Sequence, residues 1–157
     1  MNTTHMNDHS NPMPAGLGKR LLAMSYDLLL LAALLFIAEI LPVALNHGKA
    51  INPGNGWLVF YVLHPLYLLF VCFGFLGWFW THGGQTLGMK TWKLKMISLN
   101  EGAISWQQAG LRFATSLLSW LCGGLGFIWI VFDKDKRSWH DMASATKMIH
   151  CSSKVKV

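Results

Sequence analysis

Two long apolar segments dominate the sequence, and each predicts a membrane-spanning helix. The first covers residues 17–45 and the second covers residues 57–81. A helix needs roughly 20 apolar residues to cross about 30 Å of hydrocarbon, so both segments are long enough. Trp57 at one end of the second segment and Trp78 and Trp80 at the other have the spacing of two aromatic belts. We therefore expect two helices that cross a bilayer.

The third apolar segment, residues 109–132, is interrupted at its middle by Gly123 and Gly124. Glycine loosens a helix or lets the chain turn back. Ahead of the segment, Ser105 and Gln108 have capping-box spacing, which predicts that a helix begins near Trp106. The pattern therefore predicts a helix that starts normally and then breaks.

The distribution of basic residues favours a third segment that turns back. Lysine and arginine concentrate on the cytoplasmic side of membrane proteins. With a broken or re-entrant third segment, every basic residue outside the apolar segments except Lys49 lies on or near that side. Three full crossings would put all the basic residues after position 133 outside. We therefore prefer the re-entrant form, with both termini in the cytoplasm, and a third full crossing remains the alternative.

The region between the second and third segments has the pattern of a strand. Leu94 and Met96 alternate with Lys93 and Lys95, a period of two that indicates a short extended segment at the membrane surface. The turn signal that follows it at residues 100–102 predicts a small cytoplasmic β-hairpin, with an amphipathic segment as the alternative.

These elements form one domain with a tail at each end. Residues 1–16 are polar and lack apolar periodicity, which predicts a disordered tail. Residues 17–149 form the predicted transmembrane domain, and residues 150–157 form a basic C-terminal tail. The predicted fold class is an all-α membrane protein, with two transmembrane helices and a broken third segment.

Composition supports a membrane protein and excludes other classes. Only 13% of the 157 residues are charged, against about 25% in soluble domains. The net charge of +6 is explained by the cytoplasmic bias of basic residues, and no nucleic-acid-binding motif accompanies it. Three cysteines without CxxC spacing indicate neither a disulfide framework nor a zinc site. No catalytic motif is present, so we expect neither an enzyme nor a cofactor.

Asp27 lies inside the first apolar segment and needs an explanation. An ionised group at the bilayer centre costs at least about 2.5–3.5 kcal/mol, so Asp27 requires a partner, water or a proton. Arg20 lies two helical turns earlier on nearly the same face. Glu39 is too far around and along the helix to share this site, and we expect it at the outer interface or against a neighbouring helix. His64 is interpreted as a structural histidine, with a proton relay as the alternative.

Three motifs occur in order along the chain. Residues 19–23 read Lys-Arg-Leu-Leu-Ala and lead to Asp27, residues 84–90 read Gly-Gln-Thr-Leu-Gly-Met-Lys, and Phe132-Asp133 is followed by Ser138-Trp139-His140-Asp141. Together they resemble the RDD family of small bacterial membrane proteins, named for one arginine and two aspartates. The resemblance extends over residues 16–149. It departs from the family at Met89, where a basic residue is expected, and at Trp139, where a smaller aliphatic residue is common.

The resemblance implies roles for particular residues. It maps the arginine onto Arg20, the first aspartate onto Asp27 and the second onto Asp141, with Asp133 as the second candidate. The family-motif loop contains Gly84, Gln85, Thr86 and Gly88. We expect Arg20, Asp27 and Asp141 to approach one another near the cytoplasmic leaflet, together with Arg112, whose guanidinium can hold a carboxylate bidentately.

Two functions remain open for this constellation. The family resemblance implies a protein of the bacterial inner (cytoplasmic) membrane that is suspected of transport. Asp27 would then be a site for a monovalent cation or a proton, and a chain this small would need to form a homo-oligomer. The alternative is a non-transporting scaffold or accessory subunit, in which the same charges fix helix packing.

Overall fold

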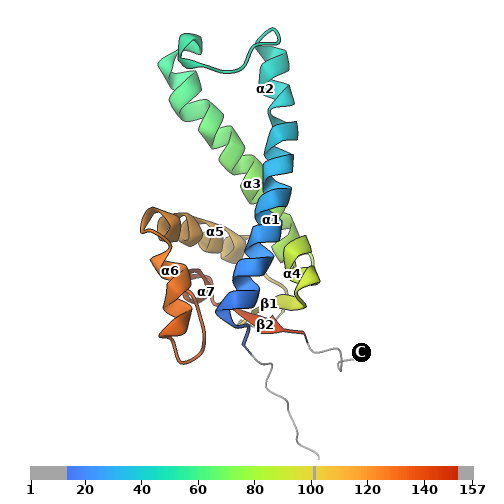
Figure 1. Cartoon of the computed structure of the whole chain (residues 1–157), viewed down its shortest axis with the longest axis vertical. Coiled ribbons are helices and arrows are strands. Elements are labelled where there is room, and N and C mark those ends of the chain that lie inside the picture. The colour runs from blue at the N-terminus through green and yellow to red at the C-terminus, as the bar shows by residue number, and fades with distance from the viewer. Residues whose placement is uncertain (1–13, 101, 152–157) are drawn as a thin grey trace, which may run out of the picture.

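The structure is a computed structural model that describes residues 14–100 and 102–151. Helix α1 (Leu17–Ala38) continues after a break at Glu39 into α2 (Ile40–Leu45), and together they form a membrane-length helix, Leu17–Leu45. A loop with the short 3-10 turn η1 (Pro53–Asn55) leads to the π-helical turn η2 (Val59–Leu63) and α3 (His64–Thr81). The span Val59–Thr81 is the second membrane-length helix. Figure 1 shows the two as an antiparallel pair joined at the top of the view.

The third apolar segment is broken, as predicted. Helix α5 (Trp106–Leu121) ends just before Gly123 and Gly124, whose φ angles of +68° and +81° are in the left-handed region that favours glycine. The chain then forms α6 (Leu125–Ile128) and the 3-10 turn η3 (Trp129–Val131), and its axis has turned by 109°. Helix α5 consequently runs across the long axis of the molecule, while α6 runs along it (Figure 1). The predicted capping box of Ser105 and Gln108 is present at the start of α5.

The predicted strand forms, but the predicted hairpin is wrong. Strand β1 (Leu94–Ser98) pairs antiparallel with β2 (Thr146–His150), a segment about fifty residues further along the chain, in a register that sets Met96 opposite Met148. Leu94 and Met96 are buried, which explains the alternation in the sequence. Alternation identifies a strand with one buried face, but it carries no information about which strand pairs with it.

Residues next to both predicted domain boundaries take part in the fold. Pro14 forms a bridge with Ile149, and the N–H of Ala15 donates to the carbonyl of Met148 at 3.1 Å. The described fold thus includes residues 14–16, which were assigned to the N-terminal tail, and β2 includes His150. The rest of the two predicted tails, residues 1–13 and 152–157, lies outside the described residues.

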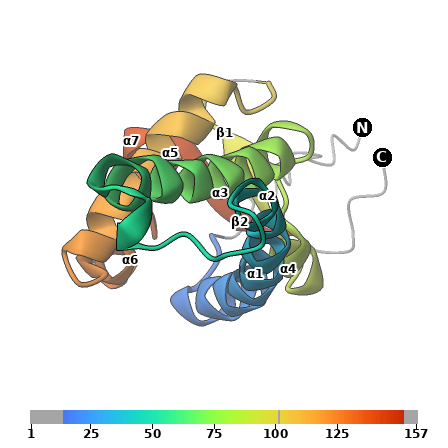
Figure 2. The ribbon, with the colours of Figure 1, turned by 90° about the horizontal axis from the view of Figure 1, so that it is seen from above.

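The buried core is confined to one end of the molecule. It lies where the first turns of α1, the end of α3, the sheet and the short helix α4 (Leu87–Thr91) meet, and it contains Ala23, Trp80, Met89, Leu94 and Met96. A second short helix, α7 (Trp139–Ala143), packs against α5 at this end. Seen from above, α3 and α5 lie across the molecule while α1 and α2 are viewed nearly end-on (Figure 2).

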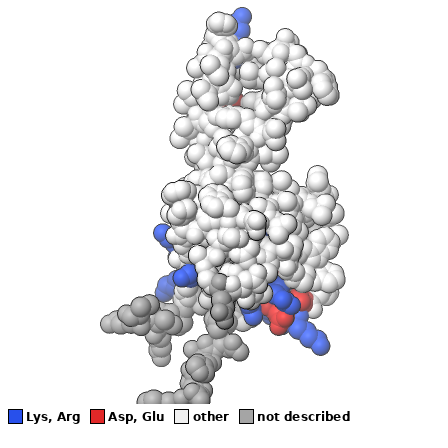
Figure 3. All heavy atoms as spheres, turned by 180° about the vertical axis from the view of Figure 1, so that it is seen from behind, with Lys and Arg blue, Asp and Glu red and all other residues white. Residues whose placement is uncertain are grey.

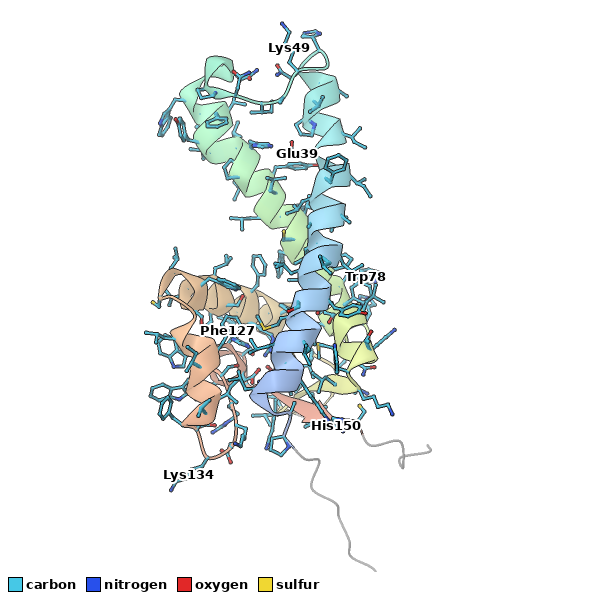
Figure 4. All side chains as sticks on the ribbon, viewed as in Figure 1. Glu39, Lys49, Trp78, Phe127, Lys134 and His150 are labelled. Atoms are coloured by element: carbon cyan, nitrogen blue, oxygen red, sulfur yellow. The ribbon has the colours of Figure 1, made fainter. Side chains whose placement is uncertain are left out.

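The other half of the molecule exposes apolar side chains. Phe36, Ile37 and Leu45 on the first long helix and Phe70 on the second are each more than 60% exposed. Most of the described lysine, arginine and aspartate side chains gather at the lower end, around the core, as Figure 3 shows. Lys49 lies at the opposite end (Figure 4). An apolar surface of this extent between two charged ends is the surface expected of helices in lipid.

Candidate functional site

A buried carboxylate joins two arginines at the core end. Oδ2 of Asp141 accepts from Nη1 of Arg20 at 2.5 Å, and Oδ1 accepts from Nη1 of Arg112 at 2.5 Å. The three side chains are at most 4% exposed. The arginines come from α1 and α5 and the aspartate comes from α7, so one carboxylate links three helices. We call these three residues the RDR cluster.

Local structure holds Asp141 in position. It is the third residue of α7, and it forms a capping box with Ser138: the N–H of Ser138 donates to Oδ2 of Asp141 at 3.2 Å, and the N–H of Asp141 donates to Oγ of Ser138. Ser-x-x-Asp is a capping spacing that is visible in the sequence, although it was not assigned this role above. The same carboxylate therefore begins a helix and closes the ion pairs.

All three nitrogens of the Arg20 guanidinium donate hydrogen bonds. Besides Asp141, its Nε donates to the carbonyl of Ala15 at 3.1 Å and its Nη2 donates to the carbonyl of Lys136 at 2.9 Å. Each of its three nitrogens thus has a partner. Arg20 fastens α1 to the segment before it and to the turn before α7.

Burial and charge decide which groups around the RDR cluster are ionised. Burial alone would raise the pKa of Asp141, but Arg112 and then Arg20 hold this pKa well below its usual range. Burial, and next the charge of Arg112, lower the pKa of His140 to about 3. Asp141 is therefore an anion and His140 is neutral at physiological pH. The two guanidinium groups and the carboxylate leave one positive charge on the cluster.

Asp27 is held by the family-motif loop and does not join the ion pairs. Its Oδ2 accepts from the hydroxyl of Thr86 at 2.5 Å, and its Oδ1 accepts from the N–H of Gly88 at 2.9 Å. Asp27 and Arg20 line the same cavity, but within the described residues the carboxylate of Asp27 is bound by the loop and not by an arginine. Thr86 is also the N-cap of α4, where its Oγ accepts from the N–H of Met89. Asp27 and Thr86 together fasten α4 to α1.

The glycines of the loop allow two close backbone approaches. Gly84 has a φ of +67°, and a Cβ there would overlap the carbonyl oxygen of Met96. A Cβ on Gly88 would overlap the carbonyl oxygen of Ala23 and lie 2.9 Å from Oδ1 of Asp27. Gln85 donates from Nε2 to the carbonyl of Leu94 at 2.6 Å. The loop motif is thus explained by the packing of α1, α4 and β1 against one another.

Asp133 lies apart from the RDR cluster. It accepts from the N–H of Arg137 at 2.8 Å, and its carboxylate lies 3.7 Å from Nε of the same arginine. Asp135, which is largely exposed, pairs with Arg137 as well. Asp133 therefore shapes the turn between η3 and α7. Of the two candidates for the second family aspartate, Asp141 is the one that contacts Arg20.

Glu39 and His64 form a separate pair in the upper half of the molecule. Nε2 of His64 lies 2.8 Å from Oε1 of Glu39, and the hydroxyl of Tyr67 donates to the carbonyl of Ala38 at 2.9 Å. Glu39 points into the space between the two long helices (Figure 4). These contacts hold the junction of α1 and α2 against α3. Glu39 thus lies against a neighbouring helix, one of the two positions expected for it.

A cavity of about 510 Å³ lies beside the RDR cluster. Arg20, Asp27 and Arg112 contribute its charged lining. Its apolar lining includes Leu28 of α1, Leu76 of α3, Trp120 of α5 and Phe127 of α6, the last of which is labelled in Figure 4. Within residues 14–100 and 102–151, no group of three or more His, Cys, Asp or Glu side chains is placed to hold a metal ion.

Two membrane-length apolar helices, a bent third pair and a buried charge cluster at one end define a helical membrane protein. The model of the RDD family matches residues 14–145, and the chain belongs to this family, as its motifs predicted. No curated protein and no solved structure matches the chain.

Proposed function

We propose that this chain is a membrane scaffold or accessory subunit, in which the charges named by the family fix the packing of the helices. The observation that carries this proposal is the RDR cluster, whose one carboxylate is engaged on both oxygens by two buried guanidinium groups. A carboxylate held in this way is not free to exchange a cation. Removing one partner of a buried ion pair costs about 3–5 kcal/mol, so the cluster is suited to fixing helices in one arrangement.

The charge balance of the cavity argues in the same direction. A monovalent cation in the cavity would meet two guanidinium groups, those of Arg20 and Arg112. The carboxylate of Asp141 is already bound to both of them, so Asp27 supplies the carboxylate of the lining. Both oxygens of Asp27 are occupied by donors from the loop. The cavity thus lacks the excess of oxygen ligands that a cation requires.

Transport of a proton or a monovalent cation is the second candidate, and one observation favours it. Asp27 lies within a membrane-length helix and lines the cavity, so its carboxylate has a space from which a proton or ion could reach it. Transport through so small a chain would require a homo-oligomer. The scaffold requires no particular oligomeric state.

Flux measurements separate the two candidates. Proteoliposomes with purified wild type or Asp27→Asn are loaded with a pH-sensitive dye and challenged with gradients of Na⁺, K⁺ or Li⁺. The scaffold proposal expects the same dye response as protein-free vesicles in both cases. A cation-dependent response that Asp27→Asn abolishes, with both proteins equally well folded by circular dichroism, would replace the scaffold with transport. If the chain is a scaffold, Asp141→Asn should reduce the abundance of the chain and of its complexes on native gels of solubilised membranes. Asp133→Asn should leave both unchanged.

We further propose a multi-pass protein of the bacterial inner membrane, with both ends of the domain and the sheet in the cytoplasm. The pairing of β1 with β2, and of residues 14–15 with β2, supports one side for all three segments. Because β1 precedes α5 and β2 follows α6, a common side supports a third segment that turns back. The lysines and arginines at that end support the cytoplasm as this side (Figure 3).

Thiol labelling tests this topology. In a background with Cys72→Ser and Cys122→Ser, Cys151 should react with a membrane-impermeant reagent only after permeabilisation. Lys49→Cys, in a further Cys151→Ser background, is the matched control and should react in intact cells. Labelling of Cys151 in intact cells would contradict the proposed orientation.

A further inference from the structure

Arg112 has an unused donor edge, unlike Arg20. Its Nη1 donates to Asp141 and also to the hydroxyl of Thr146 at 3.0 Å. Within the described residues, neither its Nε nor its Nη2 donates a hydrogen bond to the protein. The guanidinium lies over the ring of Trp80, 5.6 Å from its centroid, and the side chain is only 4% exposed. The edge formed by Nε and Nη2 is the one that grips a carboxylate or a phosphate bidentately.

This arginine lines the cavity of about 510 Å³. The volume is within the range of about 300–1,000 Å³ that is typical of small-molecule sites, and apolar walls with a few polar groups at one end are also typical of them. The walls extend to the outer surface of the helices, because Leu28 and Trp120, which line the cavity, are 61% and 62% exposed. An apolar ligand could therefore enter from the lipid-facing side.

The unengaged donor edge of Arg112, more than the total charge of the lining, favours an anion, because Asp27 lines the cavity as well. The RDR cluster carries one positive charge, and His140, which also lines the cavity, is neutral because its pKa is lowered to about 3. The hydrogen-bond donors on Thr86 and Gly88 already engage the carboxylate of Asp27. A buried charge without a full complement of partners is costly in an apolar environment. An oxyanion at this edge would give Nε and Nη2 of Arg112 the acceptors that the described residues do not supply.

We infer that the cavity binds a single anionic lipid, with oxyanion headgroup oxygens on the Nε and Nη2 edge of Arg112 and an acyl chain along Leu28, Trp120 and Phe127. The apolar walls distinguish this occupant from a free anion, because an inorganic ion would leave them without a partner. The site is separate from the scaffold role, since the packing of helices by Asp141 uses the other nitrogen of Arg112.

The matched variants are neighbours on α5. Ser116 lines the cavity one helical turn after Arg112, so Ser116→Phe fills the space without touching the ion pairs. Ala114 is exposed on the same helix and does not line the cavity, so Ala114→Phe adds the same ring elsewhere. Arg112→Lys keeps the charge and removes the bidentate edge, and it is used only if its circular dichroism matches that of wild type.

Native mass spectrometry of the purified full chain, in a non-ionic detergent, measures the binding. The probes are dioleoylphosphatidylglycerol, dioleoylglycerol with the same acyl chains and no charge, and inorganic phosphate. Wild type and Ala114→Phe should retain one phosphatidylglycerol per chain and bind the uncharged lipid at least about tenfold more weakly, the scale of one lost charge-assisted hydrogen bond. Ser116→Phe should lower phosphatidylglycerol retention about tenfold as well.

The opposite results overturn the inference. Equal retention of the charged and uncharged lipids would remove the role of Arg112. Equal binding of inorganic phosphate would make the site one for a small anion instead of a lipid. Unchanged retention by Ser116→Phe would place the lipid elsewhere on the apolar surface, even if Arg112→Lys fails to fold.

Discussion

Replacing Asp141 with asparagine tests the central claim that one carboxylate locks three helices. The change leaves the shape almost intact, and the new amide oxygen can still accept from the N–H of Ser138. It removes the carboxylate charge that pairs with both Arg20 and Arg112, whose side chains are at most 4% exposed. We expect a loss of about 3–5 kcal/mol, the cost of leaving a buried charge without its partner. For a chain of this size that loss corresponds to a decrease in Tm of about 6–20 °C.

The dependence of stability on pH gives the same prediction a second readout. The folded-state pKa of Asp141 lies well below the unfolded value of about 3.9. The stabilisation is therefore complete above about pH 4 and is lost as the pH falls below it, towards the folded pKa. Asp141→Asn should lack this component, so its Tm should depend less on pH below about 4 than the Tm of wild type.

Thermal unfolding of the purified chain in detergent, followed by circular dichroism, measures both effects. Asp133→Asn is the matched control, because Asp133 pairs with Arg137 in a partly exposed turn, and such pairs contribute up to about 1 kcal/mol. Adding Arg112→Gln to Asp141→Asn should recover part of the loss, since one uncompensated guanidinium disappears. The reasoning fails if Asp141→Asn shifts the Tm no more than Asp133→Asn does.

Three further predictions concern neighbouring groups. His140 is buried in its neutral form with a pKa of about 3, so the stability of wild type should fall as the pH drops below about 6.5. The free energy of unfolding should decrease by up to roughly 1.4 kcal/mol per pH unit, and thermal scans of His140→Gln should show a flatter decline. Gly88→Ala should lower the Tm measurably while Gly83→Ala does not, because an added Cβ overlaps a backbone oxygen at Gly88 and has no neighbour within 4 Å at Gly83; equal shifts would contradict the close approach. Thr86→Val removes the hydroxyl that donates to Asp27 and should cost about 1–3 kcal/mol in chemical denaturation, and a change within error would show that this hydrogen bond contributes little.

Several features of the fold follow from short stretches of sequence. The two long apolar segments predict the two membrane-length helices because length and hydropathy suffice to define a span. The glycines at 123 and 124 predict the break after α5 because they can adopt positive φ at little cost. Ser105 and Gln108 predict the start of α5 because a capping box requires only residues three positions apart.

The candidate site could be predicted only in part. The family motifs identified Arg20, Asp27 and Asp141, and position on the third helix added Arg112. The pairing among them was not predictable, because it depends on where α7 is brought by the bend after α5. Thr86, Ser138 and Trp80, which position these charges, were not assigned that role, and only Ser138 carried a local signal, its spacing to Asp141.

By itself, the sequence determined the class of protein, the two spans, the broken third segment and the strand at residues 94–98, because each depends on periodicity or caps within a few turns of chain. Only the tertiary structure decided that β1 pairs with β2, that Asp27 is bound by the motif loop, and that Arg112 lines a cavity. Those outcomes depend on contacts between segments that are far apart in the sequence. A carboxylate within a membrane helix requires a partner on energetic grounds. Whether that partner is a guanidinium, a hydroxyl or a backbone N–H depends on which distant segments pack against the helix.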